Sequence, residues 1–238
     1  MEDILIENVS IPVDDGKIFL NGSIYYTNDT PEKTPWIINI PAFMEDRNGK
    51  FVKIFTEKFA KVGYYVLAYD PLPGKQTGRN WIKFFDKIFF FLPEVISWIL
   101  DNQKNRILDK KIALFGRSYG GAIILTQGFK DIRAKFLIAL CTRYDYATVG
   151  QRKINFGEEL IRNVSPKFYL NKDPSNNNRI LIAHCKDDET IPFENLSQIK
   201  EQLGLNDENV LIYDTGGHSF KGNRENLFQE ILKFLKKL

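Results

Sequence analysis

Short, continuously apolar runs alternate with longer amphipathic stretches over most of the chain. A strand that is covered on both faces has no polar face, so such runs are typical of parallel strands in an α/β sheet. The stretches between them place their apolar residues at helical spacing. This alternation predicts an α/β fold with a mostly parallel, doubly wound sheet and right-handed crossovers. The predicted strands are residues 36–40, 64–69, 111–115, 136–140, 180–184 and 210–214, and the predicted helices are residues 50–63, 93–103, 119–129, 193–204 and 224–238.

The N-terminal part of the chain has a different pattern. Residues 4–13 and 17–26 flank the turn sequence Asp14-Asp15-Gly16, which predicts an antiparallel hairpin. No linker rich in Pro, Gly or Ser divides the chain, so we predict a single domain over residues 1–238. The segment from about 142 to 178 is too long for a plain connection. It predicts a small lid insertion at the carboxyl ends of the strands.

The composition limits which binding partners and which cellular compartment can be expected. The net charge is only +3 and no long basic block occurs, so nucleic acid is not an expected partner. The two cysteines, Cys141 and Cys185, are too few for a disulfide framework and form no metal-spaced pair. The N-terminus is acidic and lacks a signal-peptide pattern, so a cytoplasmic protein is predicted. The most apolar segment, residues 81–100, carries four charged side chains and Pro93, which is expected to break the helix and to exclude a membrane span.

The sequence Gly-Arg-Ser-Tyr-Gly-Gly at residues 116–121 places Ser118 between two glycines. A G-x-S-x-G pentapeptide is common by chance, but this one directly follows a predicted strand and directly precedes a predicted helix. A strand, a sharp turn and a helix are the context of a nucleophile elbow, in which the backbone of the serine is strained. Gly116 and Gly120 would let the strand and the helix approach closely.

A serine hydroxyl becomes a useful nucleophile when a neighbouring imidazole takes its proton. The chain contains only two histidines, His184 and His218. His184 ends an apolar strand and is interpreted as structural. His218 lies in a glycine-rich loop between the last predicted strand and the last predicted helix, where its side chain can reach Ser118. We therefore predict His218 as the general base.

The imidazole needs a carboxylate that fixes its tautomer and stabilises the imidazolium. The strand that ends at residue 184 is followed by Asp187, Asp188 and Glu189. Asp188 is the first choice for the acid. Asp187 is the main alternative, and Asp145, which follows the preceding strand, is a more distant one.

Three motifs in this order, GRSYGG, HCKDDETIP and GGHSF, resemble those of the α/β-hydrolase family. The chain is most similar to its branch of small serine esterases, acyl peptidases and dienelactone hydrolases. The resemblance runs from about residue 35 to residue 220. It implies the α/β-hydrolase fold, in which the order of nucleophile, acid and histidine is the one found here. Matching the second motif residue by residue places its acid at Asp188.

The resemblance also implies an oxyanion hole and no metal or organic cofactor. Its two backbone N–H donors would come from Tyr119, which follows the nucleophile, and from Phe43 in the loop after the first predicted parallel strand. This chain has Pro41-Ala42 before Phe43, where the family usually has His-Gly. Backbone donors tolerate such a change of side chains.

The sequence thus predicts a serine hydrolase that cleaves carboxylic esters or related acyl compounds through a Ser118-Asp188-His218 triad and an acyl-enzyme. Its expected partner is a small-molecule acyl ester, and a homodimer is compatible with the sequence. One alternative is an acyl-aminoacyl or oligopeptide hydrolase, prompted by GRSYGG. Another is a non-catalytic binding protein, prompted by Pro41-Ala42. The aromatic cluster at residues 84–91 is interpreted as core and pocket wall, with an exposed patch as the alternative.

Overall fold

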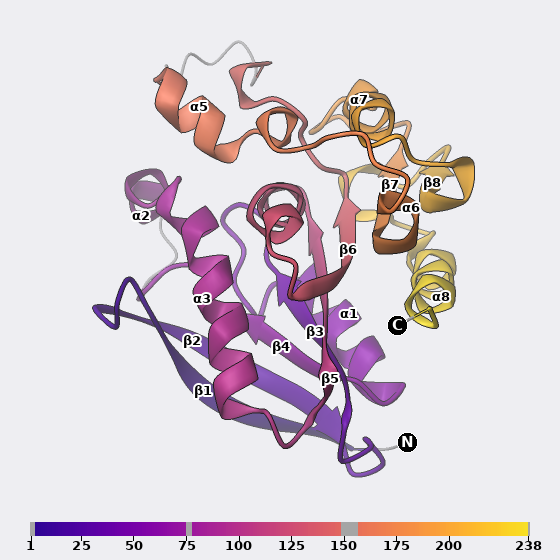
Figure 1. Cartoon of the computed structure of the whole chain (residues 1–238). Coiled ribbons are helices and arrows are strands. Elements are labelled where there is room, and N and C mark those ends of the chain that lie inside the picture. The colour runs from indigo at the N-terminus through magenta and orange to yellow at the C-terminus, as the bar shows by residue number, and fades with distance from the viewer. Residues whose placement is uncertain (1–2, 75–77, 149–156, 238) are drawn as a thin grey trace.

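A computed structural model describes residues 3–74, 78–148 and 157–237, and the order of its elements follows the predicted alternation (Figure 1). The strands are β1 Ile4–Val13, β2 Ile18–Thr27, β3 Thr34–Ile40, β4 Tyr65–Tyr69, β5 Ile107–Arg117, β6 Ala134–Leu140, β7 Ile180–Cys185 and β8 Val210–Tyr213. The α-helices are α1 Lys50–Lys61, α2 Gly78–Lys83, α3 Lys87–Asn102, α4 Tyr119–Ile123, α5 Glu158–Val164, α6 Asn176–Arg179, α7 Glu194–Leu203 and α8 Arg224–Leu235. Four single 3₁₀ turns are η2 Tyr146–Thr148, η3 Pro166–Phe168, η4 Asp207–Asn209 and η5 Gly217–Ser219, and a π-helical turn, η1 Ile124–Gly128, continues α4.

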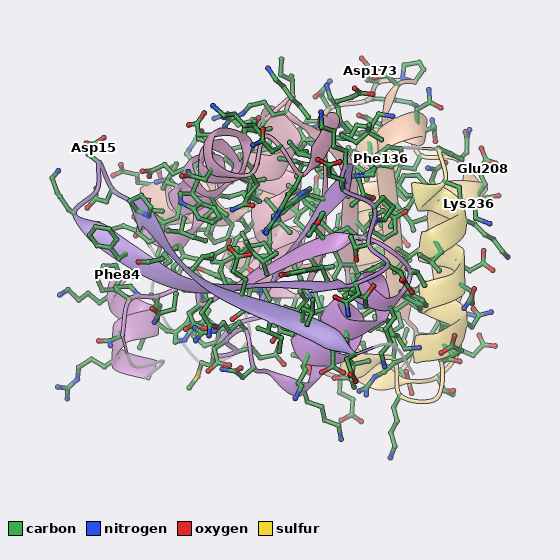
Figure 2. All side chains as sticks on the ribbon, turned by 90° about the horizontal axis from the view of Figure 1, so that it is seen from below. Asp15, Phe84, Phe136, Asp173, Glu208 and Lys236 are labelled. Carbon is green, nitrogen blue, oxygen red and sulfur yellow. The ribbon has the colours of Figure 1, made fainter. Side chains whose placement is uncertain are left out.

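The strands form one eight-stranded sheet in the order β1-β2-β4-β3-β5-β6-β7-β8. β1 pairs antiparallel with β2, and β2 pairs antiparallel with β4. Every other neighbouring pair, from β4-β3 to β7-β8, is parallel. The predicted mostly parallel sheet with an N-terminal antiparallel hairpin is therefore confirmed. Asp15 marks the tip of the hairpin in Figure 2, on the opposite side of the molecule from Glu208 and Lys236.

Helices cover both faces of the sheet because alternate side chains of its central strands point to opposite sides. Ile37 of β3 belongs to the apolar cluster that contains the buried faces of α1 and α8. Its neighbours Trp36 and Ile38 belong to the cluster that contains α3, α4, η1 and α7. Figure 1 shows α3 in front of the sheet and α1 behind it. Strands covered on both sides explain the continuous apolar runs of the sequence.

The expectation that Pro93 breaks the helix is wrong, because Pro93 lies inside α3. The proline removes one intrahelical hydrogen bond, at a cost of about 3 kcal/mol. Seven buried apolar side chains of α3, among them Phe89 and Phe91, pack against the sheet and offset this cost. Most of the aromatic cluster is thus core, whereas Phe90 is 44% exposed. In the part of the chain that the structure describes, no helix is both long enough and apolar enough to cross a bilayer.

The carboxyl ends of β5, β6 and β7 lie side by side at one edge of the sheet. The N–H of Ser118, directly after β5, donates to the carbonyl of Leu140 in β6, and the N–H of Cys141, directly after β6, donates to the carbonyl of Ala183 in β7. The lid predicted over about 142–178 begins at this edge. Residues 149–156 of it lie outside the described residues, so the lid stays a prediction.

Candidate active site

Ser118 occupies a strained turn between β5 and α4. Its φ of 59° and ψ of −116° lie in a region that residues other than glycine rarely adopt, and such a conformation costs about 1–3 kcal/mol. The turn is fixed from both sides, since the Ser118 N–H donates to Leu140 and its carbonyl accepts from the Ala122 N–H. The side chain is only half-buried. This is the geometry predicted for a nucleophile elbow.

The glycines around Ser118 are required by close backbone contacts. A methyl group at Gly120 would overlap the carbonyl oxygen of Ile40 and lie 2.9 Å from that of Pro41, and one at Gly116 would lie 3.0 Å from the Ile40 oxygen. At Gly121 the contact is with a side chain, because a methyl group there would overlap the Thr142 hydroxyl. The three glycines therefore let α4 begin directly against β3 and the end of β6.

The structure brings His218 and Asp188 together across 30 residues of chain. Asp188 follows β7, and His218 lies in the loop after β8, which we call the histidine loop (residues 214–223). His218 Nδ1 lies 2.8 Å from Asp188 Oδ2. Oδ1 of the same carboxylate accepts from the N–H groups of Thr190 at 2.8 Å and Ile191 at 3.0 Å. Asp188 is buried, so these donors fix both of its oxygens.

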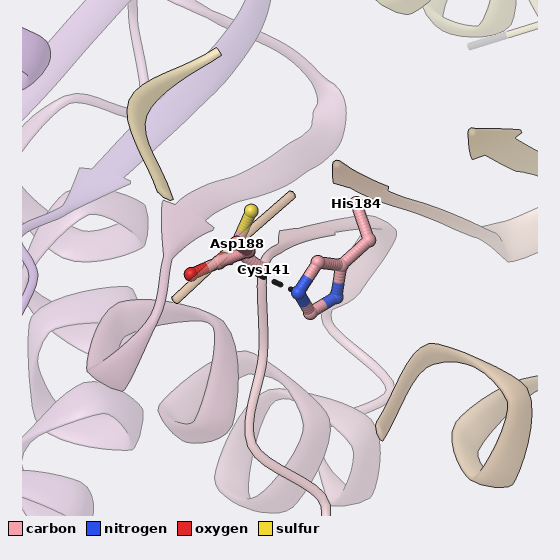
Figure 3. A group of neighbouring side chains, drawn as sticks. All are labelled: Cys141, His184 and Asp188. Atoms are coloured by element: carbon pink, nitrogen blue, oxygen red, sulfur yellow. Dashed lines mark ion pairs between the residues drawn. The ribbon is translucent and has the colours of Figure 1, made fainter. Parts of the chain in front are cut away.

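His184, interpreted from the sequence as structural, contacts the same carboxylate (Figure 3). Its Nε2 lies 3.2 Å from Asp188 Oδ2 and 3.0 Å from the carbonyl oxygen of Ile191. A carbonyl only accepts, so Nε2 carries the proton. Burial alone would raise the pKa of Asp188, but the hydrogen bonds from His184, His218 and the Ile191 N–H outweigh it and hold that pKa well below its ordinary value.

Asp187, the main alternative to Asp188, has a different position. Its two carboxylate oxygens accept from the backbone N–H groups of Gly216 at 3.0 Å and Gly217 at 2.8 Å. Asp187 thus binds the backbone of the histidine loop, whereas Asp188 binds the imidazole itself. Asp145, the more distant alternative, forms an ion pair with Lys167 at 2.5 Å.

Cys141, His184 and Asp188 are the one group among the described residues whose side chains could together hold a metal ion, with their ligand atoms within 4.8 Å of one another (Figure 3). The chemistry of the group fits a metal poorly. Burial raises the pKa of the Cys141 thiol strongly, whereas a metal binds the thiolate. Both oxygens of Asp188 are already held by the donors described above.

The two residues predicted to form the oxyanion hole lie next to each other. Phe43 follows β3 in the loop before α1, which we call the oxyanion loop (residues 41–49), and its ring centroid lies 5.9 Å from that of Tyr119. The Phe43 ring also lies 5.0 Å from the ring of Trp81 and 6.0 Å from that of Phe85. Phe43 is 41% exposed and Tyr119 is buried. The exposed Phe43 ring, backed by these buried rings, therefore lies beside the position at which the two backbone N–H groups are predicted to act.

The Prolyl oligopeptidase family matches residues 54–238, a segment that contains Ser118, Asp188 and His218. The sequence matches none of the curated proteins significantly.

Solved structures of several hydrolases are similar to this chain. Pyrococcus horikoshii acylaminoacyl peptidase has a TM-score of 0.75 at 16% identity, over 98% of this chain but only 42% of the peptidase. A protein designated a dienelactone hydrolase from Klebsiella pneumoniae has a TM-score of 0.72 at 14% identity, over 99% of this chain and 100% of that one. The Pyrococcus furiosus esterase Pf2001 has a TM-score of 0.67 at 19% identity, over 98% of this chain and 93% of the esterase. At such identities the likeness concerns the fold, and it confirms the predicted α/β-hydrolase fold.

Proposed function

This chain belongs to the prolyl oligopeptidase family, and on that premise we propose that it is a serine hydrolase of carboxylic esters or related acyl compounds. The observation that carries the proposal is the 2.8 Å contact between His218 Nδ1 and Asp188 Oδ2. An imidazole held through Nδ1 has Nε2 as the nitrogen that can take a proton from Ser118. The strained turn of Ser118 supports the same role, since strain of this kind is found at functional sites.

In the proposed mechanism, His218 takes the proton of Ser118 while the hydroxyl oxygen attacks the acyl carbonyl. The negative charge that develops on the carbonyl oxygen is stabilised by the backbone N–H groups of Tyr119 and Phe43. His218 then gives its proton to the leaving group, which departs and leaves an acyl-enzyme. Water repeats these steps and releases the acid. Asp188 remains ionised throughout, because its pKa lies well below its ordinary value.

Ester substrates are favoured by the aromatic side chains beside the proposed oxyanion hole. Phe43 is exposed and is backed by the buried rings of Trp81, Phe85 and Tyr119, and such an apolar surface suits an apolar acyl group. The second candidate is an acyl-aminoacyl peptide, favoured by the family match and by the likeness to an acylaminoacyl peptidase. This chain spans 42% of that enzyme, so the activity of the whole peptidase is carried over only as a proposal.

The experiment that tests the proposal compares two substrate classes on the wild type and on Ser118→Ala. We expect p-nitrophenyl butyrate to be hydrolysed faster than blocked aminoacyl amides, and a fluorophosphonate probe to label Ser118. A folded wild type that forms no Ser118 adduct would favour the non-catalytic binding protein. A Ser118→Ala variant that retains full esterase activity would refute the assignment of the nucleophile.

A further inference from the structure

Arg117, the residue before the proposed nucleophile, contacts two loops that carry other parts of the proposed site. Its Nη1 donates to the carbonyl oxygen of His218 at 3.1 Å and to the Ser219 hydroxyl at 2.5 Å. Its Nη2 donates to Glu45 Oε1 at 2.6 Å. One guanidinium thus connects the nucleophile elbow with both the histidine loop and the oxyanion loop.

The contact with Glu45 continues to the predicted oxyanion donor. Oε2 of Glu45 accepts from the Ala42 N–H at 3.4 Å, and the Glu45 N–H donates to the Ala42 carbonyl at 3.0 Å. Ala42 directly precedes Phe43. The position of the Phe43 backbone therefore depends on a carboxylate that Arg117 holds.

The side chain of Arg117 is buried, with 7% of its surface exposed, and its guanidinium lies 4.5 Å from the centre of the Phe51 ring. The ion pair with the half-buried Glu45 adds little stability compared with apolar side chains of the same volume, because the buried guanidinium loses its hydration. Stability alone therefore does not explain why an arginine occupies this position. A planar fork that reaches acceptors in two directions suits a residue that sets the distance between two loops.

We propose that Arg117 is a positioning residue that fixes the histidine loop and the oxyanion loop relative to Ser118. This inference rests on the proposed function and extends it. When the guanidinium is removed, His218 and Phe43 can each move relative to the elbow. Displacements of about 1 Å in a reacting geometry can lower the rate by about 100-fold.

The test compares three variants of the full chain with the wild type, using p-nitrophenyl butyrate. The double variant Arg117→Met/Glu45→Leu replaces the ion pair with apolar side chains, so it leaves no unpaired buried charge and is expected to fold. We expect its kcat to fall by about 100-fold, with KM changed by less than about threefold. Arg117→Lys keeps the charge beside Glu45 but lacks the fork, and we expect its kcat to fall by about 10-fold.

Arg133→Met is the control, since it removes another arginine that forms an ion pair. Arg133 donates to Asp131 at 2.6 Å and to the Pro93 carbonyl at 3.0 Å, just before β6 begins and so at the edge of the sheet opposite Ser118. Its loss should lower the melting temperature and leave kcat unchanged.

The possible results separate the positioning role of Arg117 from the proposed serine hydrolase activity. A folded double variant with wild-type kcat overturns the positioning role while the serine hydrolase stands. If the double variant does not fold, Arg117→Lys decides, and a wild-type kcat in that variant overturns the positioning role. A folded wild type that is neither active nor labelled at Ser118 overturns the proposed function, and the role of Arg117 with it.

Discussion

Replacing Asp188 with asparagine changes one atom and reverses the polarity of the contact to His218. The N–H groups of Thr190 and Ile191 both donate to Oδ1 of Asp188, so the amide oxygen of the asparagine will occupy that position. Its NH2 group then takes the place of Oδ2, 2.8 Å from His218 Nδ1. Nδ1 must now accept a hydrogen bond, which moves the imidazole proton to Nε2.

An imidazole with its proton on Nε2 cannot take the proton of Ser118. A change of this kind in a serine triad lowers kcat by about 10⁴-fold, which corresponds to about 5 kcal/mol of transition-state stabilisation. The same substitution removes charged hydrogen bonds to two histidines, each worth about 1.5–3 kcal/mol, so we expect the free energy of unfolding to fall by about 3–6 kcal/mol. The kcat of the variant is therefore referred to the folded fraction that its unfolding curve gives.

The assay is kcat for p-nitrophenyl butyrate at neutral pH, together with urea unfolding of the same samples. Asp131→Asn is the control, because Asp131 is also largely buried and paired with an arginine, Arg133, at 2.6 Å. It should lose stability but keep its kcat. An Asp188→Asn variant that keeps kcat within about 10-fold of the wild type, while Ser118→Ala is inactive, would refute this reasoning and return the acid role to Asp187 or Asp145.

Three further outcomes follow from the same contacts. Gly120→Ala should lower the free energy of unfolding by about 1–3 kcal/mol, measured in urea, because its methyl group meets the rigid carbonyls of Ile40 and Pro41; an unchanged midpoint would contradict the close approach. His184→Gln should lower kcat by about 10-fold with little change in KM, since Asp188 loses one of its two imidazole contacts; a change in KM alone would argue against this. The pKa of Asp188 is lower in the folded chain than its ordinary value of 3.8, so its ionisation stabilises the fold above about pH 4 and this contribution is lost as pH falls further. The difference in unfolding free energy between the wild type and Asp188→Asn should therefore narrow progressively as pH falls below about 5, and parallel curves below that pH would contradict the lowered pKa.

The strands were predictable because the sheet buries them on both faces. An apolar run such as residues 111–115 indicates a buried strand without any knowledge of its neighbouring strands, and it lies within β5. The course of α3 through Pro93 was not predictable, because it depends on the packing of the whole helix against the sheet. Local propensity gives the cost of the proline, whereas tertiary burial decides the outcome.

The candidate site was partly predictable for a related reason. The chain has two histidines. His184 ends a predicted strand and His218 lies in a predicted loop, and this difference was enough to favour His218 as the base. Asp187 and Asp188 are adjacent, and in the sequence only the resemblance of the second motif favours Asp188. In the structure one binds the backbone of the histidine loop and the other binds the imidazole, a difference that depends on how the chain turns after β7.

The contacts of Arg117 could not be predicted from the sequence, because its partners Glu45 and His218 lie 72 and 101 residues away. Three costly features nevertheless lie at one edge of the sheet: the strained backbone of Ser118, the buried charge of Arg117 and the buried Nδ1 of His184, which finds no hydrogen-bond partner among the described residues. Each of them lowers the stability of the folded chain, and stability alone explains none of them. Departures from local rules that cluster in this way are expected where a fold carries a function. Other departures lie elsewhere, such as the positive φ of Asp109 and Lys110 in the first half of β5, so these three features add to the support that the motif and the family match give to the proposed site.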